Sequence, residues 1–440
     1  MTTASIDRRT FFLAGTTTLA HAGLTSRAIE PEAARRFDLG PGKVEPGYIQ
    51  VLPETNYTKE RGHGFEPGAK VVGIDRGGNA RHSRFCTADQ PFYFSVTVPE
   101  GNYTVTVTLG DASGESATTV KAELRRLMVE HVGTGKGKLE TRSFTVNVRT
   151  PQIAGGGEVK LKDREKKDEW WAWDEKLTLE FNGRRPCVCE VEILRVDVPT
   201  IYLLGDSTVC DQPTEPFASW GQMLPRFFKP EIAVANNAES GETVASSTNA
   251  GRLRKVLSVM KPGDYLLMQF GHNDMKSTAP DADQKYKAAL ISWVKQTREK
   301  GGAPILITPM NRHTFDGDTV TNSLRDYPDM VRQAAKEQNV PLIDLNIMSK
   351  ALYESFGPNP SIQLFEHNPD LSKFDATHHS PFGAYELSKC IVQGIEQNKL
   401  DLAKFIVDDW QPFDPAHPDS PEKFTVPPSP NFSTTKPLGN

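Results

Sequence analysis

The chain has 440 residues, a formal net charge of −5 and a sequence pI near 6.1. Its length allows two or three domains with full cores, and its weakly acidic balance gives no basic footprint for nucleic acid. Five cysteines, an odd number, do not describe a disulfide framework. Cys187 and Cys189 alternate in a strand-like run, and no Cys or His cluster has the spacing of metal ligands. We therefore expect neither a bond between these two cysteines nor a metal site.

Residues 1–34 carry the signs of an export signal. Arg8 and Arg9 precede a mildly apolar stretch, rich in Ala and Thr, that reaches Leu24. This pattern resembles a twin-arginine signal peptide with a small-residue cleavage region near 26–28 or 32–34, and a basic, amphipathic or disordered terminus is the alternative. The apolar stretch is too short and too polar to span a bilayer. We predict a periplasmic or extracellular protein that has no membrane partner once the signal is removed.

Residues 37–198 are predicted to form an all-β domain. Apolar and polar side chains alternate in short runs separated by turn residues such as Glu100-Gly101, and Val198-Pro199 gives a boundary; the runs lie at 92–98, 103–109, 143–148, 176–181 and 188–194. This is typical of a β-sandwich, here jelly-roll-like. The tryptophans at 170, 171 and 173 either form a platform on which a sugar ring stacks or supply at least one core residue. The sandwich either binds glycan itself or shapes one wall of a neighbouring cleft.

Residues 199–408 alternate between strand-like and helix-like segments. We predict strands at 201–204, 232–235, 264–270, 304–308 and 341–345, and helices near 217–228, 248–260, 284–300, 323–338 and 381–397. Such alternation predicts an α/β fold with a parallel five-stranded sheet covered by helices on both faces. Loops 309–322 and 353–374 are the expected walls of a cleft, where Arg312 and His313 either contact an acidic sugar or belong to a solvated loop. The Pro-rich residues 409–440 predict an extended or disordered tail.

The turn after the first of these strands presents a candidate nucleophile. The apolar run 201–204 stops at Gly205-Asp206-Ser207. A small-residue turn at the end of a parallel strand places a hydroxyl at the sheet edge where open α/β folds bind ligands. Asp206 is expected to anchor this loop, since the serine can obtain its base elsewhere.

Later segments supply a base and hydrogen-bond donors. Asp375 and His378 are three residues apart, so the carboxylate can hold one imidazole nitrogen while the other faces a hydroxyl. Asn273 follows an apolar strand, and its amide can donate to an oxyanion. Gly241 lets its backbone N–H approach a reacting oxygen, and the N–H of Ser207 is a third donor. His379, next to the expected base, leaves open which histidine acts.

These blocks, in this order, resemble the SGNH or GDSL hydrolases. Gly205-Asp206-Ser207, Gly241, the 271–274 segment and the 375–378 segment correspond to the family's signature blocks, and the likeness covers roughly residues 199–400. Within the family, the sequences around them are most similar to rhamnogalacturonan acetylesterases. Glu242-Thr243 departs from the Arg-Ser-like sequence expected after the second block. The sandwich resembles the galactose-binding-like domains that accompany carbohydrate esterases.

The resemblance implies a three-layer SGNH fold and an esterase that removes acetyl groups from pectic polysaccharide. Ser207, His378 and Asp375 would form an acyl-enzyme triad, with an oxyanion hole from Ser207, Gly241 and Asn273 and no cofactor. Two alternatives stay open: an esterase for another acetylated glycan, such as xylan or sialic acid, or for a lipid, and a non-catalytic carbohydrate-binding protein. The sequence assigns no substrate-binding residues, acetylated hydroxyl or oligomeric state.

Overall fold

The computed structural model describes Met1, residues 34–77, 82–433 and Pro437, so the predicted signal peptide lies almost entirely outside the described residues. The chain after it begins with β-strands. These are β1 (Arg35–Leu39), β2 (Ile49–Val51), β3 (His63–Phe65), β4 (Val72–Asp75), β5 (Arg84–Thr87), β6 (Phe92–Thr97), β7 (Gly101–Gly110), β8 (Ser116–Ala122), β9 (Arg126–Thr134), β10 (Leu139–Val148), β11 (Lys176–Asn182) and β12 (Val188–Val196).

These strands form two facing sheets, which we call the N-terminal sandwich (residues 35–196). One sheet has the order β3-β6-β11-β8-β9, and the other runs β10-β7-β12-β1-β2 with β5 and β4 at its side. In β7 the alternate residues Tyr103, Val105 and Val107 are buried between the sheets, as the period of two in the sequence requires. The five predicted runs are all strands, which bears out the expected sandwich.

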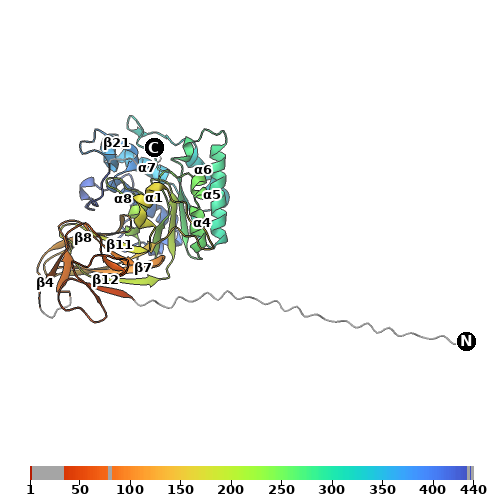
Figure 1. Ribbon diagram of the computed structural model, residues 1–440. Helices are drawn as coiled ribbons and strands as arrows, with labels where there is room; N and C mark the ends of the chain where they lie inside the picture. The colour runs from red at the N-terminus through yellow and green to blue at the C-terminus, as the bar shows by residue number, and fades with distance from the viewer. Residues whose placement is uncertain (2–33, 78–81, 434–436, 438–440) are drawn as a thin grey trace. The chain divides into compact units, whose positions relative to one another are not determined.

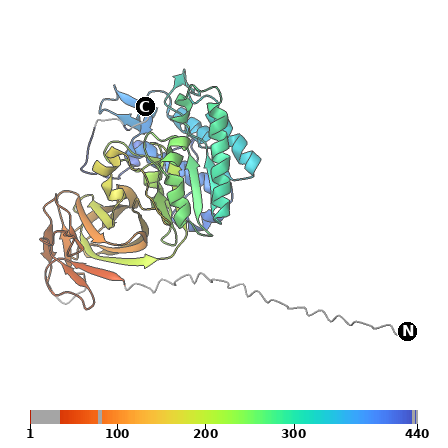
Figure 2. The same ribbon diagram turned by 45° about the vertical axis from the view of Figure 1, so that its right-hand side comes forward.

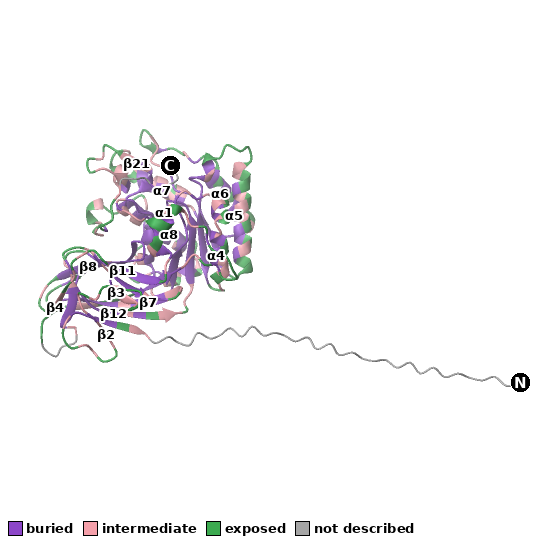
Figure 3. Cartoon of the chain, viewed as in Figure 1, coloured by how far each residue is buried: buried purple, intermediate pink, exposed green. Residues whose placement is uncertain are grey.

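The second half of the chain contains five parallel strands. They pair in the order β14 (Ala233–Asn236), β13 (Thr200–Gly205), β15 (Tyr265–Gln269), β16 (Ala303–Ile307) and β19 (Leu342–Ile343). Ile201 and Leu203 face one hydrophobic cluster, whereas Tyr202 and Leu204 face another. The strands are buried on both faces because helices cover both (Figures 1 and 3). The α/β fold class predicted from the sequence is therefore confirmed.

Helices α4, α5 and α6 cover one face of this sheet, and α2, α7 and α8 cover the other (Figure 1). The helices are α1 (Asp163–Lys167), α2 (Trp220–Met223), α3 (Val244–Asn249), α4 (Arg252–Val259), α5 (Ala282–Glu299), α6 (Tyr327–Gln338), α7 (Leu345–Phe356) and α8 (Pro381–Gln397). Two small hairpins lie in the predicted wall loops: β17 (Phe315–Asp316) with β18 (Thr319–Val320), and β20 (Phe365–His367) with β21 (Phe374–His379). None of the helices in the described chain has the length and apolar character that a bilayer crossing requires.

Two helix predictions need correction, and one helix was not predicted. The helix expected at 217–228 is only the single turn α2, followed by a 3₁₀ turn at Leu224–Phe227 that contains Pro225. The helix expected at 248–260 is present as α4, but it begins only after Gly251, whose φ is +82°, and residues 248–249 are the end of the separate helix α3. Helix α7 was not predicted, although Asp344 accepts a hydrogen bond from the N–H of Ile347 and so caps its start.

The two halves of the molecule share a sheet. Strand β10 of the sandwich pairs in parallel with β14, through Val146 opposite Val234. Within the described residues this joins the five parallel strands and one sandwich layer into a 12-stranded sheet. The tail is extended and packs on the body: Lys121 donates to the carbonyl of Pro427, and Ser429 is buried. The sandwich is thus built into the α/β half.

Candidate active site

Ser207 stands on a single tight turn after β13. The N–H groups of Val209 and Cys210 both donate to the carbonyl of Asp206. The turn comes so close to the neighbouring strand that a Cβ on Gly205 would lie 2.7 Å from the carbonyl oxygen of Gln269, so only glycine fits there. Ser207 itself is 2% exposed. The turn therefore presents its hydroxyl at the carboxyl end of the parallel sheet.

His378 and Asp375 complete a hydrogen-bonded chain with Ser207. His378 Nε2 lies 2.8 Å from Ser207 Oγ, and His378 Nδ1 lies 3.0 Å from Asp375 Oδ2. All three side chains are buried. One imidazole nitrogen is held by a carboxylate while the other faces a hydroxyl, which is the geometry of a serine nucleophile with its general base.

Asp375 is held ionised by His378 and by the turn that it caps. Its Oδ1 accepts from the N–H groups of Thr377 and His378, at 2.8 and 3.1 Å. Burial alone would raise the pKa of Asp375, but its hydrogen bond to His378, the charge of that imidazole and the two N–H donors hold the pKa well below its usual value. The carboxylate is thus available to orient the imidazole and to stabilise its protonated form.

The neighbouring His379 points elsewhere. Its Nε2 lies 2.8 Å from the hydroxyl of Tyr353, and its ring packs on Phe365. Burial, and then the charge of nearby histidines, lowers the pKa of His379 to about 3. His379 is therefore a neutral core residue, and the geometry places His378 as the residue that faces Ser207.

The three expected oxyanion donors lie on adjacent loops. The loop after β14 runs beside the Ser207 turn, since the N–H of Glu239 donates to the carbonyl of Gly205 at 3.2 Å. Gly241 has a φ of +76°, and the amide of Asn273 donates to the carbonyl of Glu242 at 3.1 Å. Within the part of the chain that the structure describes, the N–H groups of Ser207 and Gly241 donate no hydrogen bond. Both are thus available to a reacting oxygen.

Asp206 supports the nucleophile turn. Its Oδ1 accepts from the N–H and the hydroxyl of Thr208, and its Oδ2 lies 3.3 Å from His272 Nδ1. Burial would raise the pKa of Asp206, but His272 and the Thr208 donors lower it overall. These contacts agree with the predicted anchoring role.

Two cationic side chains lie beside the third and fifth blocks. Arg312 donates to the carbonyl of His272 at 3.2 Å and to the hydroxyl of Thr377 at 3.1 Å. Lys276 donates to Asn273 Oδ1 at 3.1 Å, and its pKa is lowered by burial and by the charge of Arg312.

His313 lies away from the site: its Nε2 hydrogen-bonds with the carbonyl of Pro358, and its ring packs among aromatic rings. Of the two residues singled out in the wall loop, only Arg312 lies at the site.

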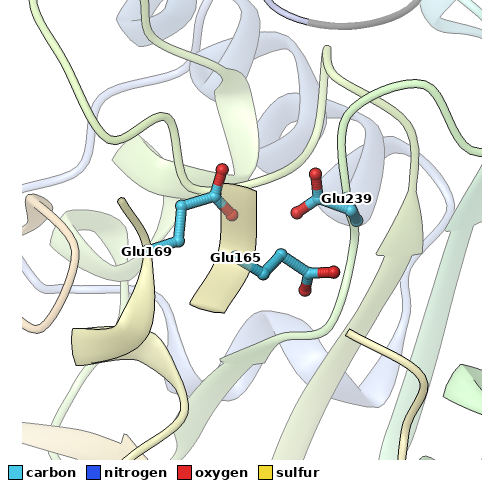
Figure 4. Close-up of side chains that lie close together, drawn as sticks. All are labelled: Glu165, Glu169 and Glu239. Carbon is cyan, nitrogen blue, oxygen red and sulfur yellow. The ribbon is translucent and has the colours of Figure 1, made fainter. Parts of the chain in front are cut away.

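A buried acidic cluster, not predicted from the sequence, adjoins the second block. Glu165, Glu169 and Glu239 each bring a carboxylate oxygen within 4.8 Å of the others (Figure 4). Arg252 pairs with Glu165 at 2.6 Å, and Arg164 donates to Glu169 at 2.6 Å. Burial, and then the charges of Glu169 and Glu165, raise the pKa of Glu239 well above its usual value. Arginines on two sides thus neutralise much of the negative charge of the cluster.

The N-terminal sandwich also reaches the nucleophile loop. Arg125 donates to the carbonyls of Gln212 and Phe217, at 2.9 and 3.0 Å, and Arg126 pairs with Asp211 at 2.8 Å. Arg125 lies just before β9 and Arg126 is the first residue of β9; both are buried. These contacts were missed by sequence reasoning, because nothing in the local pattern around 125 and 126 marks a partner some 85 residues away.

The three tryptophans differ in their burial. Trp173 is buried in a small apolar cluster with Ile153 and Val159, so the core alternative holds for it. Trp170 is 43% exposed, with Lys176 Nζ 4.6 Å from its ring centroid and the Trp171 ring packed edge-on. The indole of Trp170 is already occupied on one side by these neighbours.

Two families match different parts of the chain. Residues 203–381 match the GDSL-like lipase/acylhydrolase family. Residues 35–153 match the galactose-binding domain-like module of β-agarase and YxiM esterase-like proteins. The first match contains the Ser207, Gly241, Asn273 and His378 blocks, and the second lies within the N-terminal sandwich.

Relatives with assigned names extend this result. Rhamnogalacturonan acetylesterase RhgT of Bacillus subtilis is 38% identical over 218 residues, which is 47% of this chain and 94% of that protein. The uncharacterized esterase YxiM of Bacillus subtilis is 30% identical over 385 residues, or 85% of this chain and 93% of that protein. A crystal structure of YxiM covers 84% of this chain and 99% of its own, with 28% identity and a TM-score of 0.46. The chain belongs to the GDSL-like lipase/acylhydrolase family and is an esterase related to the rhamnogalacturonan acetylesterases.

Proposed function

We propose that the protein is a serine carbohydrate esterase that removes acetyl groups from pectic rhamnogalacturonan. The observation that carries the proposal is the continuous chain from Ser207 Oγ through the imidazole of His378 to Asp375, with spacings of 2.8 and 3.0 Å. Free hydrogen-bond donors lie next to it, as an acyl-transfer reaction requires.

In the first half of the reaction, His378 Nε2 takes the proton of Ser207 as the serine oxygen attacks the ester carbonyl. Asp375 keeps the imidazole in the required tautomer and stabilises the imidazolium. The N–H groups of Ser207 and Gly241 and the amide of Asn273 stabilise the oxyanion. The imidazolium then protonates the sugar oxygen as its bond to the carbonyl carbon breaks, so that the sugar leaves with a free hydroxyl and the acetyl group stays on Ser207.

In the second half, a water molecule loses its proton to His378 and attacks the acyl-enzyme. The same three donors stabilise the second oxyanion, and acetate leaves as Ser207 recovers its proton. Losing one such donor typically lowers turnover by about 10²–10³. Every step uses side chains and peptide groups of this chain.

Two features support a small acyl group on an acidic polymer. Ser207 is only 2% exposed, so an acetyl group reaches it more readily than a long acyl chain. Lys276 and Arg312, beside the third and fifth blocks, offer positive charge to the carboxylate of a uronic acid. The 38% identity to a protein named rhamnogalacturonan acetylesterase points to the same polymer.

The test is acetate release from acetylated rhamnogalacturonan, acetylated xylan and an aryl acetate, comparing the wild type with Ser207→Ala. Serine-dependent release that favours the pectic polymer is the expected result. Release from xylan or the aryl acetate alone would retain the mechanism and reject the substrate. Binding of the polymer without release of acetate from any ester would favour a non-catalytic carbohydrate-binding protein.

We further propose that residues 1–34 direct export by the twin-arginine route, so that the esterase meets its polymer outside the cytoplasm. Support comes from Arg8 and Arg9 ahead of a short, mildly apolar stretch. Replacing both arginines with lysine should leave the precursor in the cytoplasm of a bacterial host. Normal export of that variant would reject the proposal.

A further inference from the structure

Lys162 reaches the second block from outside the catalytic half. It lies in the chain between β10 and β11 of the sandwich, directly before α1. Helix α1 is the short yellow helix in Figure 2. Its Nζ donates to the carbonyl of Ser240 at 2.5 Å and lies 2.7 Å from Glu242 Oε1. A single ammonium group therefore contacts the residues on both sides of Gly241.

The contact with Ser240 has a direct consequence for Gly241. The carbonyl of Ser240 and the N–H of Gly241 belong to one peptide unit, which is planar and trans, so the two groups point in opposite directions. A cation that holds the carbonyl thereby fixes the direction of the N–H. It also polarises the peptide, which makes the N–H a stronger donor.

A peptide next to glycine needs such an anchor. Gly241 has no Cβ to restrict rotation, and its φ of +76° lies in the left-handed region that most residues avoid. Its N–H donates to no other group in the described chain, so no bond on that side holds the peptide. The fixed point is on the carbonyl side, at Lys162.

Lys162 is itself held in place by the helix that follows. Its backbone N–H donates to Glu165 Oε2 at 2.8 Å, and Glu165 pairs with Arg252 of α4, both side chains being fully buried. Arg164 lies 3.5 Å from Glu239, one residue before Ser240. The acidic cluster of Figure 4 thus fastens α1 to the catalytic half.

We propose that Lys162 is a positioning residue for the oxyanion hole: it orients the peptide between Ser240 and Gly241 so that the Gly241 N–H meets the developing oxyanion. This rests on the proposed esterase function. The effect belongs to the transition state, so the loss of Lys162 lowers kcat and leaves KM nearly unchanged.

A competing explanation is that Lys162 only neutralises Glu242, which is buried and stands where an Arg-like residue was expected. Removing the lysine alone would then harm the loop by leaving an unpaired buried charge. The double variant Lys162→Met/Glu242→Gln removes both charges and separates the two explanations. The glutamine can still accept from the hydroxyl of Ser246, as Glu242 does.

The experiment measures aryl acetate hydrolysis by the wild type, Lys162→Met, the double variant and Lys160→Met. Lys160 is an exposed lysine of the same segment and serves as the matched control. We expect kcat to fall by about 10- to 100-fold in both variants that lack Lys162, somewhat less than for outright loss of a donor. Lys160→Met should match the wild type.

A second measurement separates positioning from a merely structural role. An arylboronic acid adds to Ser207 and mimics the tetrahedral oxyanion. Its inhibition constant should therefore rise in step with the loss of kcat/KM. The thermal unfolding midpoint of the double variant should stay near that of the wild type. Wild-type kcat in Lys162→Met, or recovery of kcat in the double variant, would overturn the proposal. An inactive wild type would instead overturn the esterase function.

Discussion

Two pairs of active-site loops, which we call the two halves of the catalytic rim, are supported differently: one half holds the first and second blocks, and the other holds the third and fifth blocks. The third and fifth blocks are held by their own domain: Asp375 caps its own turn, and Arg312 links the carbonyl of His272 to Thr377. The first and second blocks depend on side chains of the N-terminal sandwich, through Arg126 at the nucleophile loop and Lys162 at the Gly241 loop. The base therefore comes from a self-contained element, whereas the nucleophile loop and an oxyanion donor depend on a second domain.

We expect the largest effect from deleting residues 37–198, which removes the support for the first and second blocks. The deletion removes the β10 partner of β14 and leaves Asp211 without its arginine, so we expect no folded, active remainder. Circular dichroism, thermal unfolding and aryl acetate hydrolysis measure this outcome. A soluble fragment with full activity would show that the α/β half holds the first and second blocks in place without the sandwich.

In the third and fifth blocks, Asp375→Asn tests how far the carboxylate supports the base His378. Asparagine keeps an oxygen for the N–H groups of Thr377 and His378 but no longer stabilises the imidazolium. We expect kcat to fall by about 10⁴, and the unfolding midpoint at neutral pH to fall as well, because the interactions that lower the pKa of Asp375 stabilise the fold only while the carboxylate is ionised. Asp370→Asn, an exposed residue of the same hairpin, is the control. A small loss of kcat would mean that another group holds His378.

In the sandwich-supported half, Arg126→Met tests the buried pair with Asp211. Both partners are almost inaccessible to solvent, so the variant leaves an uncompensated buried carboxylate. We expect the free energy of unfolding to fall by about 3–5 kcal/mol, measured by chemical denaturation. Arg142→Met removes an exposed arginine of β10 and should change stability little. If Arg126→Met and Arg142→Met lowered the free energy of unfolding equally, the nucleophile loop would not depend on the sandwich arginine.

A smaller effect concerns the pH dependence of stability. Burial, and secondarily the charge of Asp206, raises the pKa of Asp274 to about 7. An unfolded aspartate ionises near pH 4. Since the folded pKa is the higher one, the stabilisation is complete below about pH 4 and is lost as pH rises towards 7.

Asp274→Asn should remove this decline, because the amide stays neutral and its oxygen still accepts from the N–H of Val244. Unfolding free energies at several pH values measure the difference, which has an upper limit of about 1.4 kcal/mol per pH unit. Asp318→Asn, on an exposed hairpin, is the control. The same slope in wild type and Asp274→Asn would contradict the raised pKa.

The sequence predicted what depends on local pattern. Alternation along β7 and the apolar runs of β13 and β15 indicate strands that are buried on one or both faces. The order of the motifs predicted that Ser207 and His378 belong to one site. The residues that act across domains were not predicted. Lys162 and Arg126 lie in ordinary charged or strand-like sequence, and only the fold shows that they face the catalytic loops.

The missed elements have local causes. Gly251 lies inside the predicted 248–260 helix, and its left-handed backbone, with a φ of +82°, separates α3 from α4. Helix α7 follows β19 after the single residue Asp344, which leaves no loop sequence to mark its start. The Asp344 cap and the helical spacing of Leu345 and Leu352 were signals for that helix.

The pairing of β10 with β14 has a consequence for self-association. An open parallel sheet ends in strands whose N–H and C=O groups can pair with another chain, which is a common route to aggregation. In this protein the edge beyond β14 is taken by a strand of the sandwich, and the sheet continues until it reaches the short β2. The sandwich thus covers the β14 edge of the parallel sheet and protects it from pairing with another chain, and this role requires no sugar ligand.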